Sequence, residues 1–196
     1  LNQTVYLEPL EMDRRMIFGE PSLRTFSIDN PELDRLRRHP VHFYQDSAGD
    51  ISTNGPSDSA LRYHVTSFVS GDDAQLLRQS EGPIPLHLEH LYLQLPDRLE
   101  AAVPVLAREI TKTRVSAYDK AKAIERHLRT EYLYSTEGGH DTSRPLEDFL
   151  FTRKTGHCEY FSPAMVILLR TLGAPARPAN GFYGGDYNAF GRFYAM

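Results

Sequence analysis

The spacing of apolar residues changes near Pro96, and this change limits the folds open to the chain. Before it, residues 3–8 and 61–69 alternate polar and apolar side chains, a pattern typical of half-buried strands. After it, apolar residues recur at the helical period, first at Leu99, Val103, Leu106 and Ile110. The pattern predicts an α+β fold, with a β-rich N-terminal module over residues 1–95 and a mainly helical module from residue 96.

The junction between the two modules carries glycine, proline and mixed polar residues. Gly71-Asp-Asp73 and Gly82-Pro-Ile-Pro85 are typical of a linker, so we place the domain boundary within residues 71–95. Inside the first module, the polar stretch Asp29–Arg38 indicates a short helix or turn, and residues 47–50 a turn between strands.

Several helix signals follow Pro96. Pro104 conflicts with a continuous helix and should kink or restart it. Ser116-Ala-Tyr-Asp119 resembles a capping box, and Pro145 suits the first position of a short helix. After Arg177 the chain predicts strand, turn and strand, with the turn at residues 184–188.

The clearest helix follows Cys158, the single cysteine of the chain. Its apolar stripe extends to Gly173, which should end it, and Pro163 should disturb its first turns. The stripe consists of Phe161, Ala164, Met165, Leu168, Leu169 and Leu172. A Gly-containing loop, Thr155-Gly-His157, therefore delivers Cys158 to a helix N-terminus, where free backbone N–H groups stabilise an anion. A cysteine there is either a buried small hydrophobic residue or a reactive thiol, and the loop favours the thiol.

Composition excludes other classes of function. The 22 basic and 26 acidic residues give a net charge of −4 and are mixed along the chain, so neither a nucleic-acid surface nor a lipid-binding basic patch is indicated. The longest apolar run, Ala164–Leu169, is too short to cross a bilayer. The chain starts at Leu1, and we expect it to be a segment of a longer protein.

The chain resembles the transglutaminase-like core of bacterial membrane-anchored proteins. The motifs that carry the resemblance cover most of the chain: Val5–Leu10, Tyr92–Pro96, Ala121–Arg126, Tyr132–Tyr134, Pro145–Phe151, Gly156–Phe161, Leu168–Arg177 and Asn180–Phe182. The resemblance implies a papain-like α+β fold, in which a helical half with the nucleophile packs on an antiparallel sheet with His and Asp. Here the helical half is present with the start of that sheet.

The resemblance implies that Cys158 attacks a carboxamide of a protein or peptide and forms an acyl-enzyme, which passes to water or an amine. It also implies an extracytoplasmic, periplasmic or cell-surface, location in a membrane-anchored parent protein. No cofactor or metal is expected, because Cys158 and His157 lack further ligands at usable spacing. The family order is Cys, His, Asp, yet all eight histidines lie at or before position 157. We therefore expect the catalytic His and Asp beyond Met196, and self-association through the incomplete sheet.

Other candidate residues have plainer interpretations. Adjacent side chains on a helix point apart, so we expect His157 to make a loop contact rather than a dyad with Cys158. Tyr134 could place a hydroxyl near an oxyanion, but a packed core tyrosine is favoured. Arg170 and Arg177 should bind carboxylates or carbonyls at the helix end. Two rival hypotheses stay open: a non-catalytic binding or scaffold module, and a structural fragment with a buried cysteine.

Overall fold

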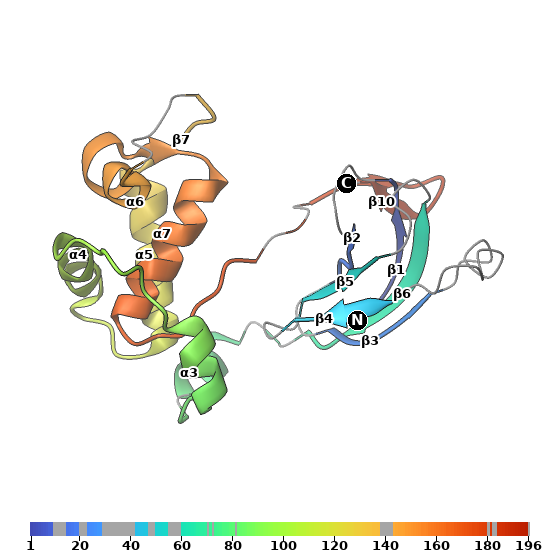
Figure 1. The fold of residues 1–196 in the computed structure, drawn as a ribbon, viewed down its shortest axis with the longest axis horizontal. Helices are drawn as coiled ribbons and strands as arrows, with labels where there is room; N and C mark the ends of the chain where they lie inside the picture. Colours follow the sequence, from blue (N-terminus) through green and yellow to red (C-terminus); the bar gives the residue numbers. More distant parts are fainter. Residues whose placement is uncertain are drawn as a thin grey trace. The chain divides into compact units, whose positions relative to one another are not determined.

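The computed structural model describes residues 1–9, 15–19, 23–28, 42–46, 50–54, 60–69, 71, 73–80, 82–137, 143–179, 181 and 184–195. The chain divides into two compact units, which we call unit 1 (Leu1–Gly71) and unit 2 (Asp72–Met196) (Figure 1). Strands come first and helices follow, so the predicted α+β class is confirmed. The predicted helix or turn at Asp29–Arg38 lies outside the described residues.

The described residues of unit 1 form two antiparallel sheets of three strands each. Their orders are β1-β6-β3 and β2-β5-β4. The strands are β1 (Asn2–Leu7), β2 (Arg15–Met16), β3 (Leu23–Ile28), β4 (Phe43–Gln45), β5 (Ile51–Thr53) and β6 (Leu61–Ser67).

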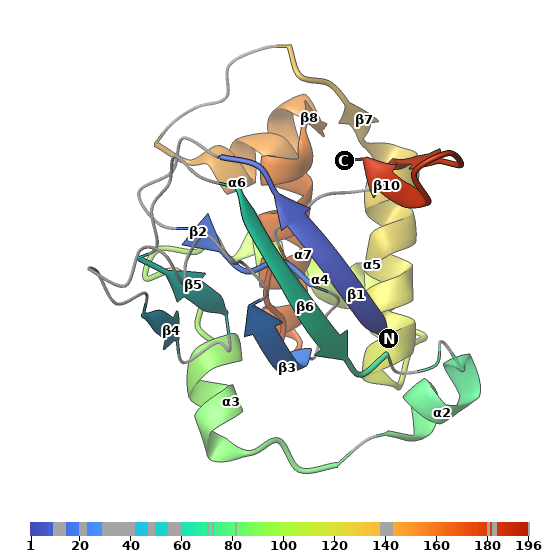
Figure 2. The same ribbon diagram turned by 90° about the vertical axis from the view of Figure 1, so that its right-hand side faces the viewer.

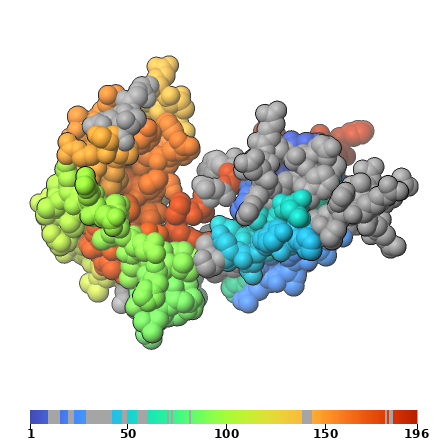
Figure 3. Space-filling model, in the orientation of Figure 1, coloured from blue at the N-terminus to red at the C-terminus, as the bar shows by residue number. Residues whose placement is uncertain are grey.

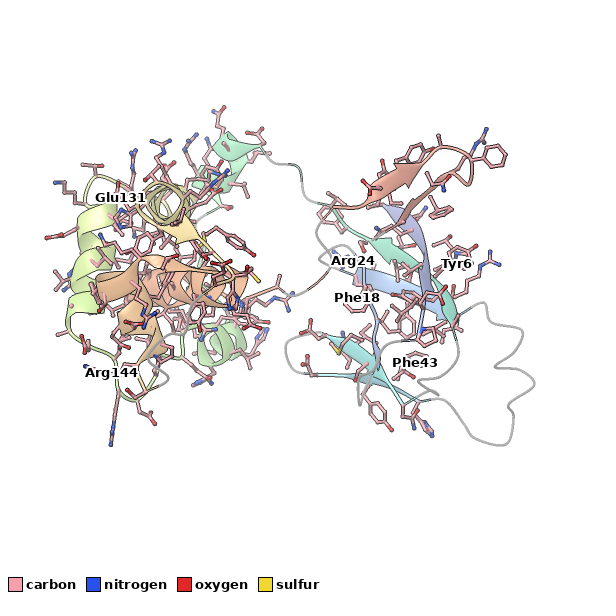
Figure 4. The ribbon with its side chains drawn as sticks, turned by 90° about the horizontal axis from the view of Figure 1, so that it is seen from above. Tyr6, Phe18, Arg24, Phe43, Glu131 and Arg144 are labelled. Carbon is pink, nitrogen blue, oxygen red and sulfur yellow. The ribbon has the colours of Figure 1, made fainter. Side chains whose placement is uncertain are left out.

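Strand β6 shows why the alternating pattern produces this unit. Leu61, Tyr63 and Val65 are buried on one face, as predicted, while the residues between them face outward. The hydroxyl of Tyr63 accepts from the Phe18 N–H (2.8 Å) and donates to the Phe18 carbonyl (3.0 Å). Burial raises the pKa of Tyr63 to about 12. Figure 4 shows Phe18 and Phe43 within unit 1, where both pack on this core.

Unit 2 is built from helices that pack on one another. The helices α4, α5 and α7 enclose its core, with α5 running alongside α7 (Figures 1 and 2). In Figure 3, the green atoms of α3, the yellow-green atoms of α4 and the orange atoms that include α7 are visible on one face of the unit. Its elements are α2 (Ala74–Gln79), α3 (Leu86–Tyr92), α4 (Ala102–Thr111), α5 (Ala117–Glu131), β7 (Leu133–Tyr134), α6 (Pro145–Glu147), the π-helix η1 (Asp148–Arg153), β8 (Thr155–Gly156), α7 (Cys158–Thr171), β9 (Asp186–Asn188) and β10 (Phe193–Ala195).

The stretch that we predicted as a linker contains two short helices, α2 and α3. Asp73 caps α2 by accepting from the N–H groups of Gln75 (2.8 Å) and Leu76 (3.3 Å). The compact units divide at Gly71 and Asp72, whereas the domain boundary at residue 95 stays a prediction. Residues following α3 are bound to unit 2, because the guanidinium of Arg170 donates to the carbonyl of Gln94 (2.8 Å).

The predicted helix starts agree with the structure. Pro104 lies in the first turn of α4, where its missing N–H removes no intrahelical bond, so the helix begins at Ala102 and Pro104 does not interrupt it. Ser116 caps α5 by accepting from the Asp119 N–H (3.0 Å), and Pro145 occupies the first position of α6. Pro163 is tolerated inside α7, which continues to Thr171.

The C-terminal hairpin differs from the prediction in one respect. Asp186–Asn188, expected as a turn, is strand β9 and pairs antiparallel with β10. The turn comes later because the side chain of Asn188 accepts from the N–H groups of Phe190 (3.0 Å) and Gly191 (2.9 Å). The expected strand before it falls partly outside the described residues.

Gly173 ends α7 as predicted. Its φ is 75°, and its N–H donates to Arg170 O (3.0 Å) while the N–H of Ala174 donates to Leu169 O (3.1 Å). These two bonds are those of a Schellman motif, in which the residue after the helix adopts the left-handed conformation. Glycine is favoured there because it has no Cβ to strain.

We therefore expect Gly173→Ala to lower the free energy of unfolding by about 1–2 kcal/mol, the left-handed penalty of an L-residue. A Cβ at Gly173 would meet no atom within 4 Å, so the cost comes from the backbone alone. Urea unfolding followed by far-UV circular dichroism measures it. Gly82→Ala is the matched control, since Gly82 is exposed and its Cβ would also meet no neighbour. Equal effects of the two substitutions would contradict this explanation.

Candidate functional site

Cys158 is the first residue of α7 and is exposed. The predicted position at a helix N-terminus is therefore confirmed, and the hypothesis of a buried cysteine is wrong. Cys158 lies outside the core because it precedes the buried residues of α7, the first of which is Ala164. The exposed thiol is accessible to a molecule in solution.

Backbone pairing fixes the chain immediately before Cys158. Strand β7 pairs in parallel with β8, with Tyr134 opposite Gly156. The Leu133 N–H donates to Lys154 O (2.9 Å), and the Ser135 N–H donates to Gly156 O (2.8 Å). The π-helix η1 ends at Lys154, whose left-handed φ of 53° redirects the chain into β8. The loop before Cys158 is therefore fixed by its hydrogen bonds to β7, which follows α5, and by the end of η1, from which it continues.

Backbone donors are available at the start of α7. The first helical hydrogen bonds run from the N–H groups of Tyr160 (2.9 Å) and Phe161 (3.2 Å) to the carbonyl of His157. The N–H groups of Cys158 and Glu159 precede these bonds, and His157 provides no side-chain cap. Such donors at a helix N-terminus bind anions, including the oxyanion that forms when a thiolate attacks a carbonyl.

Aromatic rings pack beneath the cysteine loop. Phe149 is fully buried, with ring centroids 5.0 Å from Tyr132, 4.9 Å from Phe161 and 6.0 Å from Tyr160. The hydroxyl of Tyr132 donates to Leu150 O (3.0 Å), and burial raises the pKa of Tyr132. Since Phe161 is one turn from Cys158, this cluster supports the first turn of α7.

His157 makes contacts on its own loop and helix, as expected. Its ring lies 4.9 Å from that of Tyr160 at a steep angle, and its Nδ1 is 3.9 Å from a carboxylate oxygen of Glu159. Within the described ranges, the Cys158 thiol has no hydrogen-bond partner, so the structure shows no dyad. His140, another histidine of the chain, lies outside the described residues.

The interpretation of Tyr134 as a packed core residue is wrong. Tyr134 is 61% exposed, while Tyr132 is 7% exposed and fills the core. Ile124, Leu128 and Tyr132 are spaced four residues apart and are all buried on the same face of α5 and its end. This spacing could have identified Tyr132 as the core tyrosine. The ring of Tyr134 lies 6.2 Å from Phe161, next to the first turn of α7.

Arg170, another candidate from the sequence, has a structural role. Arg170 donates to the carbonyls of Gln94 (2.8 Å) and Ala176 (2.9 and 2.7 Å), which agrees with the predicted role at the helix end. Across the described residues, His, Cys, Asp and Glu form no group of three or more that could hold a metal ion. A helix long and apolar enough to span a membrane is likewise absent from the described segments.

Comparison with known proteins matches the region around Cys158 to a family model. Residues 104–195 match the model of the transglutaminase-like superfamily. The chain is 39% identical over 104 residues to an uncharacterized protein, YebA, of Bacillus subtilis, covering 51% of this chain and 14% of that protein. It is 28% identical over 139 residues to a protein-glutamine gamma-glutamyltransferase of Pseudomonas aeruginosa, covering 70% of this chain and 20% of that protein.

A solved structure shares the fold. The periplasmic domain of TgpA from Pseudomonas aeruginosa aligns with 97% of this chain and 59% of its own, at a TM-score of 0.71 and 22% identity. The same domain bound to ethylmercury aligns at a TM-score of 0.65 and 20% identity, over 98% of this chain and 62% of its own. The chain thus spans about a seventh to a fifth of the curated relatives and about three fifths of the solved domain.

Proposed function

We propose, from the premise that residues 104–195 of this chain form part of a transglutaminase-like domain, that Cys158 is the nucleophile of a thiol acyltransferase or hydrolase. Its substrates are carboxamides of proteins or peptides. The observation that carries the proposal is the exposed thiol on the first residue of α7, beside the N–H groups of Cys158 and Glu159. The matched relative from Pseudomonas aeruginosa is named for the same chemistry, transfer from a protein glutamine.

The proposed reaction has two steps. The Cys158 thiolate attacks the amide carbon, a C–S bond forms, and the C–N bond breaks after a proton passes to the leaving nitrogen. Ammonia or an amine departs and a thioester remains. Water or a second amine then attacks the thioester carbonyl, which returns the thiol and releases an acid or a new amide. The N–H groups at the start of α7 stabilise the oxyanion in both steps.

We propose that the general base is a histidine outside residues 1–196. Support comes from the sequence, in which all eight histidines lie at or before position 157, and from His157, whose ring contacts Tyr160. A thiol acyltransferase needs a group that accepts the thiol proton and later donates one to the leaving amine. We also propose an extracytoplasmic location in a membrane-anchored parent, supported by the shared fold with a periplasmic domain.

The alternative function is a non-catalytic binding or scaffold module that keeps the fold. The exposure of Cys158 favours the enzyme, because a scaffold needs no accessible thiol at an anion-stabilising helix end. The two functions differ in whether Cys158 can accept an acyl group.

A single-turnover acylation tests the proposal. The folded chain is mixed with p-nitrophenyl acetate, and release of nitrophenolate is followed with the mass of the intact protein. We expect one acetyl group per chain, attached to Cys158, because an activated ester has a good leaving group and does not need the missing acid. Acylation should be faster in the folded chain than in the same chain in 8 M urea.

The matched control is Cys158→Ala, which leaves the fold intact because the side chain is exposed. It should lose the acetyl adduct and the burst of nitrophenolate. A folded chain that acetylates Cys158 no faster than the unfolded chain would favour the scaffold module.

A further inference from the structure

A groove of about 470 Å³ lies on the side of α5 that faces away from the core of unit 2. Its walls come from α2, the end of α4 and α5. The lining residues are Arg78, Ile110, Arg114, Tyr118, Asp119, Lys122, Ala123, Arg126, His127 and Thr130. Cys158 is not among them, so the groove is separate from the candidate nucleophile.

The charge of the groove is opposite to that of the whole chain. Arg78, Arg114, Lys122 and Arg126 face one carboxylate, Asp119, which leaves three positive charges in a chain of net charge −4. Burial lowers the pKa of His127, which disfavours the charged form of its imidazole. A hollow lined by one sign of charge concentrates ions of the opposite sign.

Arg78 is held in place before any ligand arrives. Its Nε donates to both carboxylate oxygens of Asp119 (2.9 and 3.1 Å), and its guanidinium carbon lies 5.4 Å from the ring centroid of Tyr118. The hydroxyl of Ser116 donates to the same carboxylate (3.0 Å). Asp119 thus binds the Nε of the guanidinium, and Tyr118 lies against its face. The two terminal nitrogens remain as donors for a ligand. A pre-oriented guanidinium loses little entropy on binding an anion.

The other cations of the groove differ in their ion pairs. In the described ranges, neither Arg114 nor Arg126 lies within ion-pair distance of a carboxylate, whereas Lys122 pairs with Glu125. Lys122 and Arg126 are four residues apart on α5 and therefore point to the same side, one turn apart. Ile110 and Ala123 provide a small apolar floor between the charged walls.

We propose that this groove, which we call the α5 groove, binds a ligand with two or more phosphate or carboxylate groups. Each guanidinium presents paired N–H donors that match the oxygens of such a group, and the cations that line the hollow come from α2, the segment after α4, and α5. A single-charged anion would engage only one of them. The site is independent of Cys158, so its occupancy does not depend on the proposed acyl transfer.

Binding is measured by isothermal titration calorimetry of the 196-residue chain at low salt, with sodium tripolyphosphate and with citrate as probes. We expect saturable binding of at least one probe at one site per chain, and at least tenfold weaker binding of inorganic phosphate. Stronger binding of tripolyphosphate assigns phosphate as the natural chemistry, and stronger binding of citrate assigns carboxylate. The Cys158→Ala variant should bind as the parent chain does.

Arg114→Gln and Arg126→Gln should each weaken binding by about tenfold, the loss of one charge-assisted contact. Arg126→Lys keeps the charge and should lose less. Arg108→Gln on α4 and Arg129→Gln on α5 remove the same charge from exposed positions outside the groove and should change the affinity less than twofold. Thermal melting confirms that each variant is folded. Absence of saturable binding by both probes, or equal weakening by all four glutamine variants, would overturn the proposal.

Discussion

Residues 1–196 alone are expected to show no measurable turnover of glutamine amides, even though Cys158 accepts an acyl group from an activated ester. An amide nitrogen leaves only with a proton, and the described part of the chain places no imidazole on the Cys158 thiol. Loss of catalytic residues that act as a unit costs about 10³-fold to 10⁶-fold in rate. We therefore expect the ester to acylate Cys158 once and the amide not to be turned over at all.

Ammonia release from a glutamine peptide measures this, with the 196-residue chain beside a longer chain that continues past Met196. The longer chain should turn over, and Cys158→Ala should abolish its activity. Comparable turnover by both chains, lost on Cys158→Ala, would place the base within residues 1–196. His140→Ala and His157→Ala would then identify it, while His90→Ala, an exposed histidine on α3, serves as the control.

Phe149→Ala should lower the free energy of unfolding of unit 2 by about 3–5 kcal/mol, the cost of a cavity left by a buried phenylalanine. The ring is 0% exposed and contacts the rings of Tyr132, Tyr160 and Phe161. Because two of these rings belong to the first turn of α7, the substitution should also loosen the segment that carries Cys158. Urea unfolding, followed by the helical signal at 222 nm, measures the loss.

Phe151→Ala is the matched control for that experiment. Phe151 lies two residues further along the same π-helix and is 40% exposed, so its truncation leaves no closed cavity. We expect a cost of less than about 1 kcal/mol. Similar losses for both variants would show that the aromatic cluster does not support unit 2 as described.

Local patterns predicted the parts of the fold that local chemistry decides. The alternation at residues 61–69 identified the buried face of β6, and the stripe after Cys158 identified α7 with its end at Gly173. Both apolar patterns repeat over a whole strand or helix, so they indicate which of its faces is buried. The position of Cys158 followed from the Gly-containing loop at residues 155–157, which ends just before that helix.

Features that depend on residues distant in the sequence were missed. The pairing of Tyr134 with Gly156 joins residues 22 positions apart, and neither two-residue strand has a periodicity of its own. Tyr134 lies in one of these two-residue strands, so no apolar pattern of its own could show that its side chain is exposed. The short helices α2 and α3 were masked by the prolines and glycines around them, although Asp73 is an ordinary helix cap. The α5 groove needs Arg78 brought beside α5, which no local pattern encodes.

The π-helix η1 has a consequence for how this segment varies in length. The N–H of Lys154 donates to the carbonyl of Phe149 (3.1 Å), five residues earlier, where an α-helix would use the residue four earlier. Such a turn accommodates one extra residue without changing the helix axis. A homologue shorter by a single residue between Asp148 and Arg153 can therefore form an ordinary α-helical turn and still present its cysteine in the same place. A deletion of one residue here should be tolerated in evolution, whereas the same deletion between Lys154 and Cys158 would shift the nucleophile out of register with β7.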